Sequence, residues 1–63
     1  MKPFIVVTYQ YDSTLHQNVI VETKEFTDGE EARCYFDSKT PKPNSSIWLK
    51  GDYGYNVMAV KKL

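Results

Sequence analysis

Apolar residues gather in four short stretches that polar segments separate, and this pattern predicts four β-strands. The expected strands run from Pro3 to Tyr11, Asn18 to Phe26, Ser46 to Lys50 and Tyr55 to Lys61. β-branched and aromatic residues are frequent in these stretches, as is typical of strands. Polar turn segments separate the first two strands and the last two, so the pattern predicts two hairpins.

A helix is predicted between the hairpins, from about Asp28 to about Lys39. Thr27 and Glu30 have the spacing of a capping box with Thr27 as the N-cap. Pro41 ends the helix, because proline disfavours helical backbone in the residue before it. The order ββαββ indicates an α+β protein. We expect a single domain over residues 1–63, with a four-stranded, mainly antiparallel sheet, its first strand central, and one helix on one face.

The expected helix has one apolar side. Ala32 and Phe36 fall on this side, so we expect both to pack on the sheet. Arg33 and Asp37 lie four positions apart on the outer side, where they can form an ion pair.

A sheet has two faces, and a single helix covers only one of them. In the first strand Ile5, Val7 and Tyr9 share one face. Pairing Tyr9 with Val21 matches this set with Val19 and Val21, and the combined face is expected to lie beneath the helix. A slip of one residue exchanges the two faces and is the alternative.

The second hairpin is expected to place Ile47, Leu49, Val57 and Ala59 beneath the helix. Six residues would then form an apolar patch on the uncovered face: Phe4, Val6, Ile20, Trp48, Met58 and Val60. These six are the candidate partner-binding residues, because a patch of a few hundred Å² is about the largest that a monomer normally leaves exposed. Core filling by Trp48 and Met58, and pairing of two copies sheet against sheet, are the alternatives.

Charge argues against a protein that neutralises many phosphates, because eight acidic residues balance eight basic ones. Single-stranded nucleic-acid binding is nevertheless the alternative function, since aromatic side chains on an open sheet can stack on bases. The candidate rings and amines for it are Tyr9, Trp48, Tyr53, Tyr55, Lys2, Lys24, Lys50, Lys61 and Lys62.

Catalytic and metal-binding patterns are missing from the sequence. His16 is the only histidine and Cys34 the only cysteine, and they fall in a predicted turn and on the outer helix side. No spacing of histidines, cysteines or carboxylates matches a metal site. Gly51 to Gly54 contains an acid and is expected to be a hairpin turn, not a phosphate loop. We therefore expect no enzyme activity, no cofactor, no metal and no small-molecule substrate.

With catalysis, metal binding and cofactor binding set aside, the function that remains is binding to another macromolecule. We expect a small interaction module that binds and modulates a partner protein, or pairs with a second copy as a homodimer. Small accessory and regulatory proteins of bacteria and phages are of this size and style. With one cysteine and no apolar stretch long enough to span a bilayer, we expect a soluble protein in the cytoplasm without membrane contact.

Overall fold

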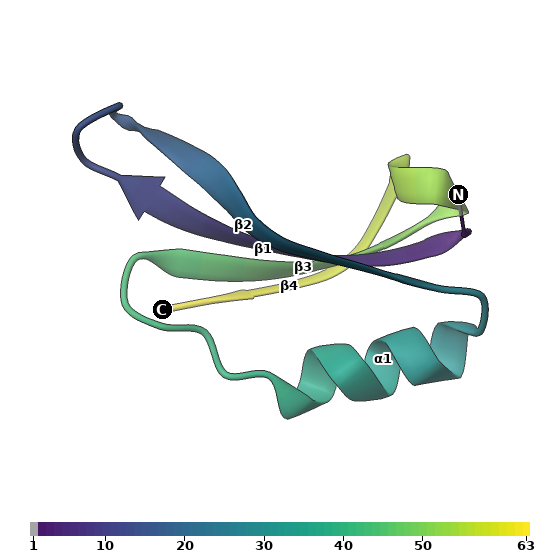
Figure 1. Ribbon diagram of the computed structural model, residues 1–63. Coiled ribbons are helices and arrows are strands. Elements are labelled where there is room, and N and C mark those ends of the chain that lie inside the picture. Colours follow the sequence, from purple (N-terminus) through teal and green to yellow (C-terminus); the bar gives the residue numbers. More distant parts are fainter. Residues whose placement is uncertain (1) are drawn as a thin grey trace.

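The computed structural model describes residues 2–63 and confirms the predicted α+β fold. The strands are β1 (Phe4–Asp12), β2 (Gln17–Phe26), β3 (Ser45–Gly51) and β4 (Asn56–Lys62), and the helix is α1 (Gly29–Ser38). All neighbouring strands are antiparallel, in the order β2-β1-β3-β4. The first strand is therefore central, as expected. Figure 1 shows α1 beneath one face of the sheet, while the other face has no α-helix over it.

Helix α1 begins one residue later than its capping pattern predicts. The N-cap is Asp28, whose Oδ1 accepts a hydrogen bond from the backbone N–H of Glu30 at 2.9 Å. The assignment of Thr27 as the N-cap is wrong, because Asp28 is an equally good capping residue and stands next to it. Lys39 has extended backbone and forms the C-cap, two residues before Pro41.

The core lies between α1 and the middle of the sheet. Ala32 and Phe36 are buried against Val6, Ile47 and Leu49, which confirms the predicted helix side. On the outer side Arg33 and Asp37 form the expected ion pair, with 3.8 Å between Arg33 Nε and Asp37 Oδ2.

The face of β1 that packs under α1 is the opposite of the one first expected. Val6 pairs with Leu49 and Phe4 with Phe26, so these residues belong to the helix-covered face. Tyr9 pairs with Ile20, not with Val21, because the register shifts between Thr8 and Tyr9. The one-residue alternative therefore holds for β1, and the placement of Phe4 and Val6 on the uncovered face is wrong.

A second irregularity lies in β4. Ala59 pairs with Leu49 and packs on the core as expected, but Val57 pairs with Lys50, so Met58 between them has no partner on β3. Val57 is 49% exposed and does not lie beneath the helix. Met58 packs over Gly51, its Sδ 2.9 Å from where a Cβ on Gly51 would stand. Gly51 is two residues after Leu49 in β3, so it lies on the same, helix-covered face. Met58 therefore lies at the end of the helix-covered face, and its predicted place on the uncovered face is wrong.

The connection from β3 to β4 is the short 3₁₀ turn η1 (Asp52–Gly54). It has left-handed backbone at three successive residues, with φ of 51° at Asp52, 57° at Tyr53 and 99° at Gly54. The backbone N–H of Tyr53 donates to the carbonyl oxygen of Pro3 at 3.0 Å. Gly54 lies next to Ile5, and Figure 1 shows η1 on the side of the sheet opposite α1.

Candidate functional site

The sheet face opposite α1, here called the open face, is the candidate site. Its central residues alternate with those of the core, so Val7, Tyr9, Trp48, Lys50 and Val60 share it. Val7 lies directly opposite Trp48 and is buried although no helix covers it. We call these five residues the Trp48 cluster.

Aromatic rings and an amine are in close contact within the Trp48 cluster. The rings of Tyr9 and Trp48 meet edge to face, with 5.9 Å between centroids and 74° between planes. Lys50 Nζ lies 5.6 Å from the Tyr9 centroid and 5.7 Å from that of Trp48, and it donates a hydrogen bond to Tyr9 Oη at 3.2 Å. The amine therefore interacts with both ring faces.

A hollow of about 380 Å³ lies beside Trp48. Its lining is mixed: Val60 is apolar, whereas Asn18, Ser46 and Lys62 are polar. Trp48 Nε1–H donates to Ser46 Oγ at 3.0 Å, so the indole is held with its polar edge toward the hollow. The open face thus combines an apolar floor with hydrogen-bonding groups at one end, as binding sites commonly do.

The six predicted partner-binding residues divide between the two sides. Trp48 and Val60 lie on the open face, and so does Ile20, which pairs with Tyr9 there. Val6 is only 1% exposed beneath α1. The ring of Phe4 packs against Gly29 at the start of α1, and Met58 lies near it.

Sequence reasoning left Val7, Tyr9 and the lysines out of the partner-binding set. Tyr9 and Lys50 did appear among the candidates for nucleic-acid binding, together with Lys62, and the structure places all three on the open face. Of the other candidate amines, Lys24 pairs with Val6 and Lys61 with Ile47, so both belong to the helix-covered face. Alternation alone sets Val7 with Tyr9 and Trp48 with Lys50, but only the register of β1 on β3 joins the two pairs on one face.

A second polar cluster joins α1 to the sheet. Tyr35 Oη donates to Glu22 Oε2 at 2.8 Å, and Lys39 Nζ donates to Glu22 Oε1. The bonds from Lys39 and Tyr35 lower the pKa of Glu22, and the same carboxylate raises the pKa values of Tyr35 and Lys39. Because these three groups satisfy one another, we interpret them as a structural clamp for α1 and not as a reactive site.

The Glu22 clamp is expected to make stability depend on pH. The pKa of Glu22 is lowered from 4.5, so its contribution is present above that value and is lost as the pH falls through the folded-state pKa. The raised pKa values of Tyr35 and Lys39 act at the other end, where stability is lost as the pH rises through them. Glu22→Gln is expected to lower the free energy of unfolding at neutral pH by about 0.5–1 kcal/mol.

Urea unfolding at acid, neutral and alkaline pH measures this effect. Glu25→Gln is the control, because Glu25 pairs with Ile5 on the other face. A Glu22→Gln variant that keeps the whole pH profile of the unmodified protein would contradict the clamp.

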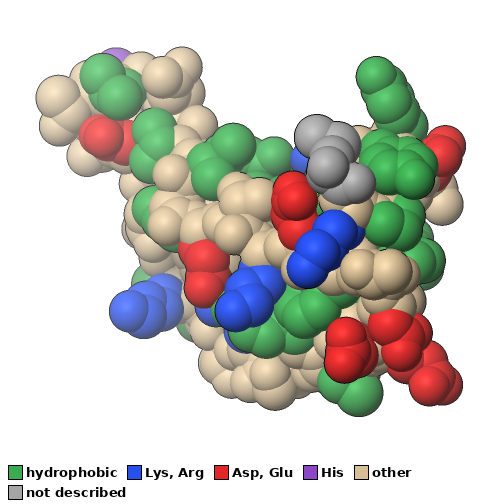
Figure 2. Space-filling view, turned by 45° about the vertical axis from the view of Figure 1, so that its right-hand side comes forward, with side chains coloured by type: hydrophobic (Ala, Val, Ile, Leu, Met, Phe, Trp, Pro, Cys, Tyr) green, Lys and Arg blue, Asp and Glu red, His purple; other side chains and the backbone are tan. Residues whose placement is uncertain are grey.

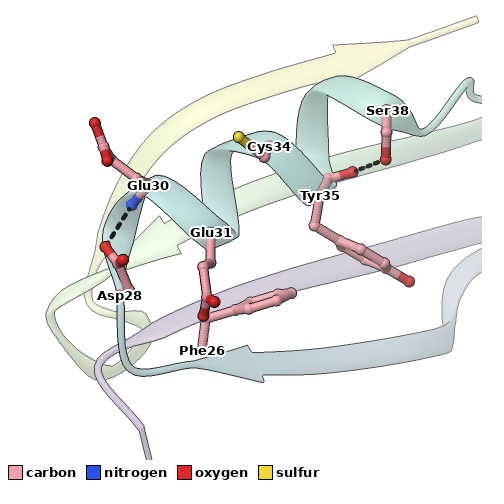
Figure 3. A pocket seen from close by; sticks show the side chains of 7 residues that line it. All are labelled: Phe26, Asp28, Glu30, Glu31, Cys34, Tyr35 and Ser38. Atoms are coloured by element: carbon pink, nitrogen blue, oxygen red, sulfur yellow. Dashed lines mark hydrogen bonds between the residues drawn. The ribbon is translucent and has the colours of Figure 1, made fainter.

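A shallow depression of about 600 Å³ runs along α1, and Figure 3 shows its lining. Phe26 and Tyr35 form its apolar wall, while the sulfur of Cys34 points away from both rings. Cys34 is exposed. His16 is at the tip of the β1–β2 hairpin, which projects from the body of the protein in Figure 2. The two residues therefore do not form a catalytic pair.

Within residues 2–63, no group of three or more histidine, cysteine or carboxylate side chains is arranged to hold a metal ion. The same part of the chain has no helix with the length and hydropathy needed to cross a membrane. Comparison with known proteins gives no family model, no curated protein and no solved structure that matches this chain. The geometry of the open face is therefore the main indication of what this protein does.

Proposed function

We propose that this protein is a small, non-enzymatic module that binds another protein through its open face. The observation that carries the proposal is the Trp48 cluster, in which two aromatic rings and aliphatic side chains gather where no helix covers them. Tryptophan and tyrosine at the centre of a surface are typical of binding hot spots. Val60, 42% exposed, extends the apolar area beside Trp48.

The edges of the sheet are poorer docking surfaces than its face. Both edge strands, β2 and β4, are irregular, because each has one residue without a partner in its register. β4 ends in Lys61 and Lys62, and β2 carries Glu22, Lys24 and Glu25. Natural proteins use bulges and charges of this kind to oppose the addition of a further strand. The edge features thus favour docking on the open face.

Single-stranded nucleic acid is the less favoured ligand. The positive charge that would follow a phosphate backbone is divided, since Lys24 and Lys61 belong to the helix-covered face. We propose a role like that of small bacterial or phage accessory proteins, which bind and regulate a larger protein in the cytoplasm.

Photo-crosslinking tests the proposed function. A benzophenone amino acid at Val60 is expected to give one discrete adduct in cells of the source organism, while the same group at Arg33, on the outer side of α1, gives none. An adduct of twice the chain's mass would identify self-association instead. An adduct that nuclease removes would identify nucleic acid, and equal adducts from both positions would contradict a role for the open face.

A further inference from the structure

Two lysines flank Trp48 on the open face. Lys50 is two residues from Trp48 along β3, while Lys62 pairs with Ser46, two residues from Trp48 in the other direction. Ser46 and Lys50 are four residues apart, which is about 13 Å at the usual rise of 3.3 Å per strand residue. The backbone positions that the two lysines flank are therefore about 13 Å apart along β3, and Trp48 lies between them.

Neither of these amines has a carboxylate partner in residues 2–63, where the ion pairs are Arg33 with Asp37 and Lys39 with Glu22. Glu25 shares the open face but belongs to the outer strand β2, and it lies within ion-pair distance of neither amine. The centre of the open face is thus positive although the chain has no net charge.

The hollow beside Trp48 provides donors for one anionic group. Asn18, Ser46 and Lys62 are among the residues that line it, and their side chains carry donor groups. A hollow lined by an ammonium group and neutral donors suits a carboxylate, because hydrogen bonds to an ionised acceptor are the stronger ones. Lys50 Nζ lies 5.7 Å from the centroid of the Trp48 ring and supplies the second charge.

We propose that the open face binds an extended acidic segment of the partner protein, in which two carboxylates four residues apart flank one apolar side chain. In an extended chain, residues i, i+2 and i+4 point to one side, and i and i+4 are about 13 Å apart. The carboxylates would meet Lys50 and Lys62, and the apolar side chain would pack on Trp48 and Val60. This inference rests on the proposed function and adds the chemistry of the partner.

Two heptapeptides test it directly. The first is acetyl-TETLTET-amide, and the second has lysine in place of both glutamates. Trp48 is the only tryptophan, so its fluorescence reports binding at the site. We expect the acidic peptide to bind at least about tenfold more tightly than the basic one, with affinity falling as salt increases.

Charge reversal completes the test. Lys50→Glu with Lys62→Glu is expected to reverse the preference, so that the basic peptide binds more tightly than the acidic one. Lys24→Glu with Lys42→Glu makes the same change in net charge away from the open face, and it should leave the preference as it was. The inference is overturned if both peptides bind equally, if neither binds at about 1 mM, or if an oligothymidine of similar charge binds more tightly than the acidic peptide.

The crosslinking experiment separates this inference from the proposed function. If the Val60 adduct forms equally well in the variant with Lys50→Glu and Lys62→Glu, the partner does not bind through an acidic segment, but docking on the open face is still supported. If Val60 gives no adduct in the unmodified protein, the proposed function itself fails.

Discussion

Val6→Lys is expected to leave the protein unfolded at 25 °C, whereas Val60→Lys is expected to fold. Both residues are valines in the middle of strands, but Val6 is 1% exposed beneath α1 and Val60 is 42% exposed on the open face. An ammonium group at Val6 would lose its hydration without an acidic partner, and Lys24 stands directly opposite in β2. Such burial costs several kcal/mol.

That cost is comparable with the whole stability of the protein. A chain of 63 residues has a free energy of unfolding of about 3–9 kcal/mol, at 0.05–0.15 kcal/mol per residue. Circular dichroism and urea unfolding of the two variants measure the contrast. A Val6→Lys variant with a native spectrum and an unchanged urea midpoint would show that the assignment of the two faces is wrong.

Trp48→Ala is expected to weaken partner binding by about 30-fold or more, which corresponds to the 2 kcal/mol or more of a hot-spot residue. The fold should survive, because the indole lies on the open face and its loss costs about 2 kcal/mol, less than the 3–5 kcal/mol of a fully buried tryptophan. Calorimetry with the crosslinked partner measures the affinity, and circular dichroism checks the fold.

Tyr55→Ala is the matched control for Trp48→Ala. Tyr55 is 89% exposed and follows η1, outside the Trp48 cluster, so its removal should change affinity by less than about twofold. If Trp48→Ala unfolds the protein, Val60→Lys tests the same surface in a variant expected to fold. Partner affinity that survives both changes would exclude the open face as the docking site.

The elements of this fold could be predicted from the sequence because each carries a local signal. Apolar stretches between polar turns mark the strands, and Ala32 and Phe36 mark the inner side of α1 by their helical spacing. The faces of β1 carry no such signal. Phe4 and Val6 are as apolar as Ile5 and Val7, so only packing against other elements decides which pair lies beneath α1.

The two positions where the register shifts explain why Tyr9 was paired with Val21 and why Val57 and Met58 were placed on the wrong faces. Val21 and Met58 each add one residue without a partner, and every side chain beyond such a residue changes face. If side chains alternated regularly from Glu22, Ile20 would lie beneath α1. Because Val21 has no partner on β1, Ile20 instead lies on the open face opposite Tyr9. A hydrophobic pattern contains no mark of such a residue, so the place of Met58 could not be predicted from the sequence.

The left-handed turn η1 links the start of the chain to the open face. Left-handed backbone costs about 1–2 kcal/mol for each residue other than glycine, so Asp52 and Tyr53 hold it only while other contacts support them. One such contact is the hydrogen bond from Tyr53 to Pro3, a residue that precedes β1. Release of Pro3 would let η1 relax and uncover Ile5. The shape of the open face is therefore coupled to the contact that holds Pro3 in place.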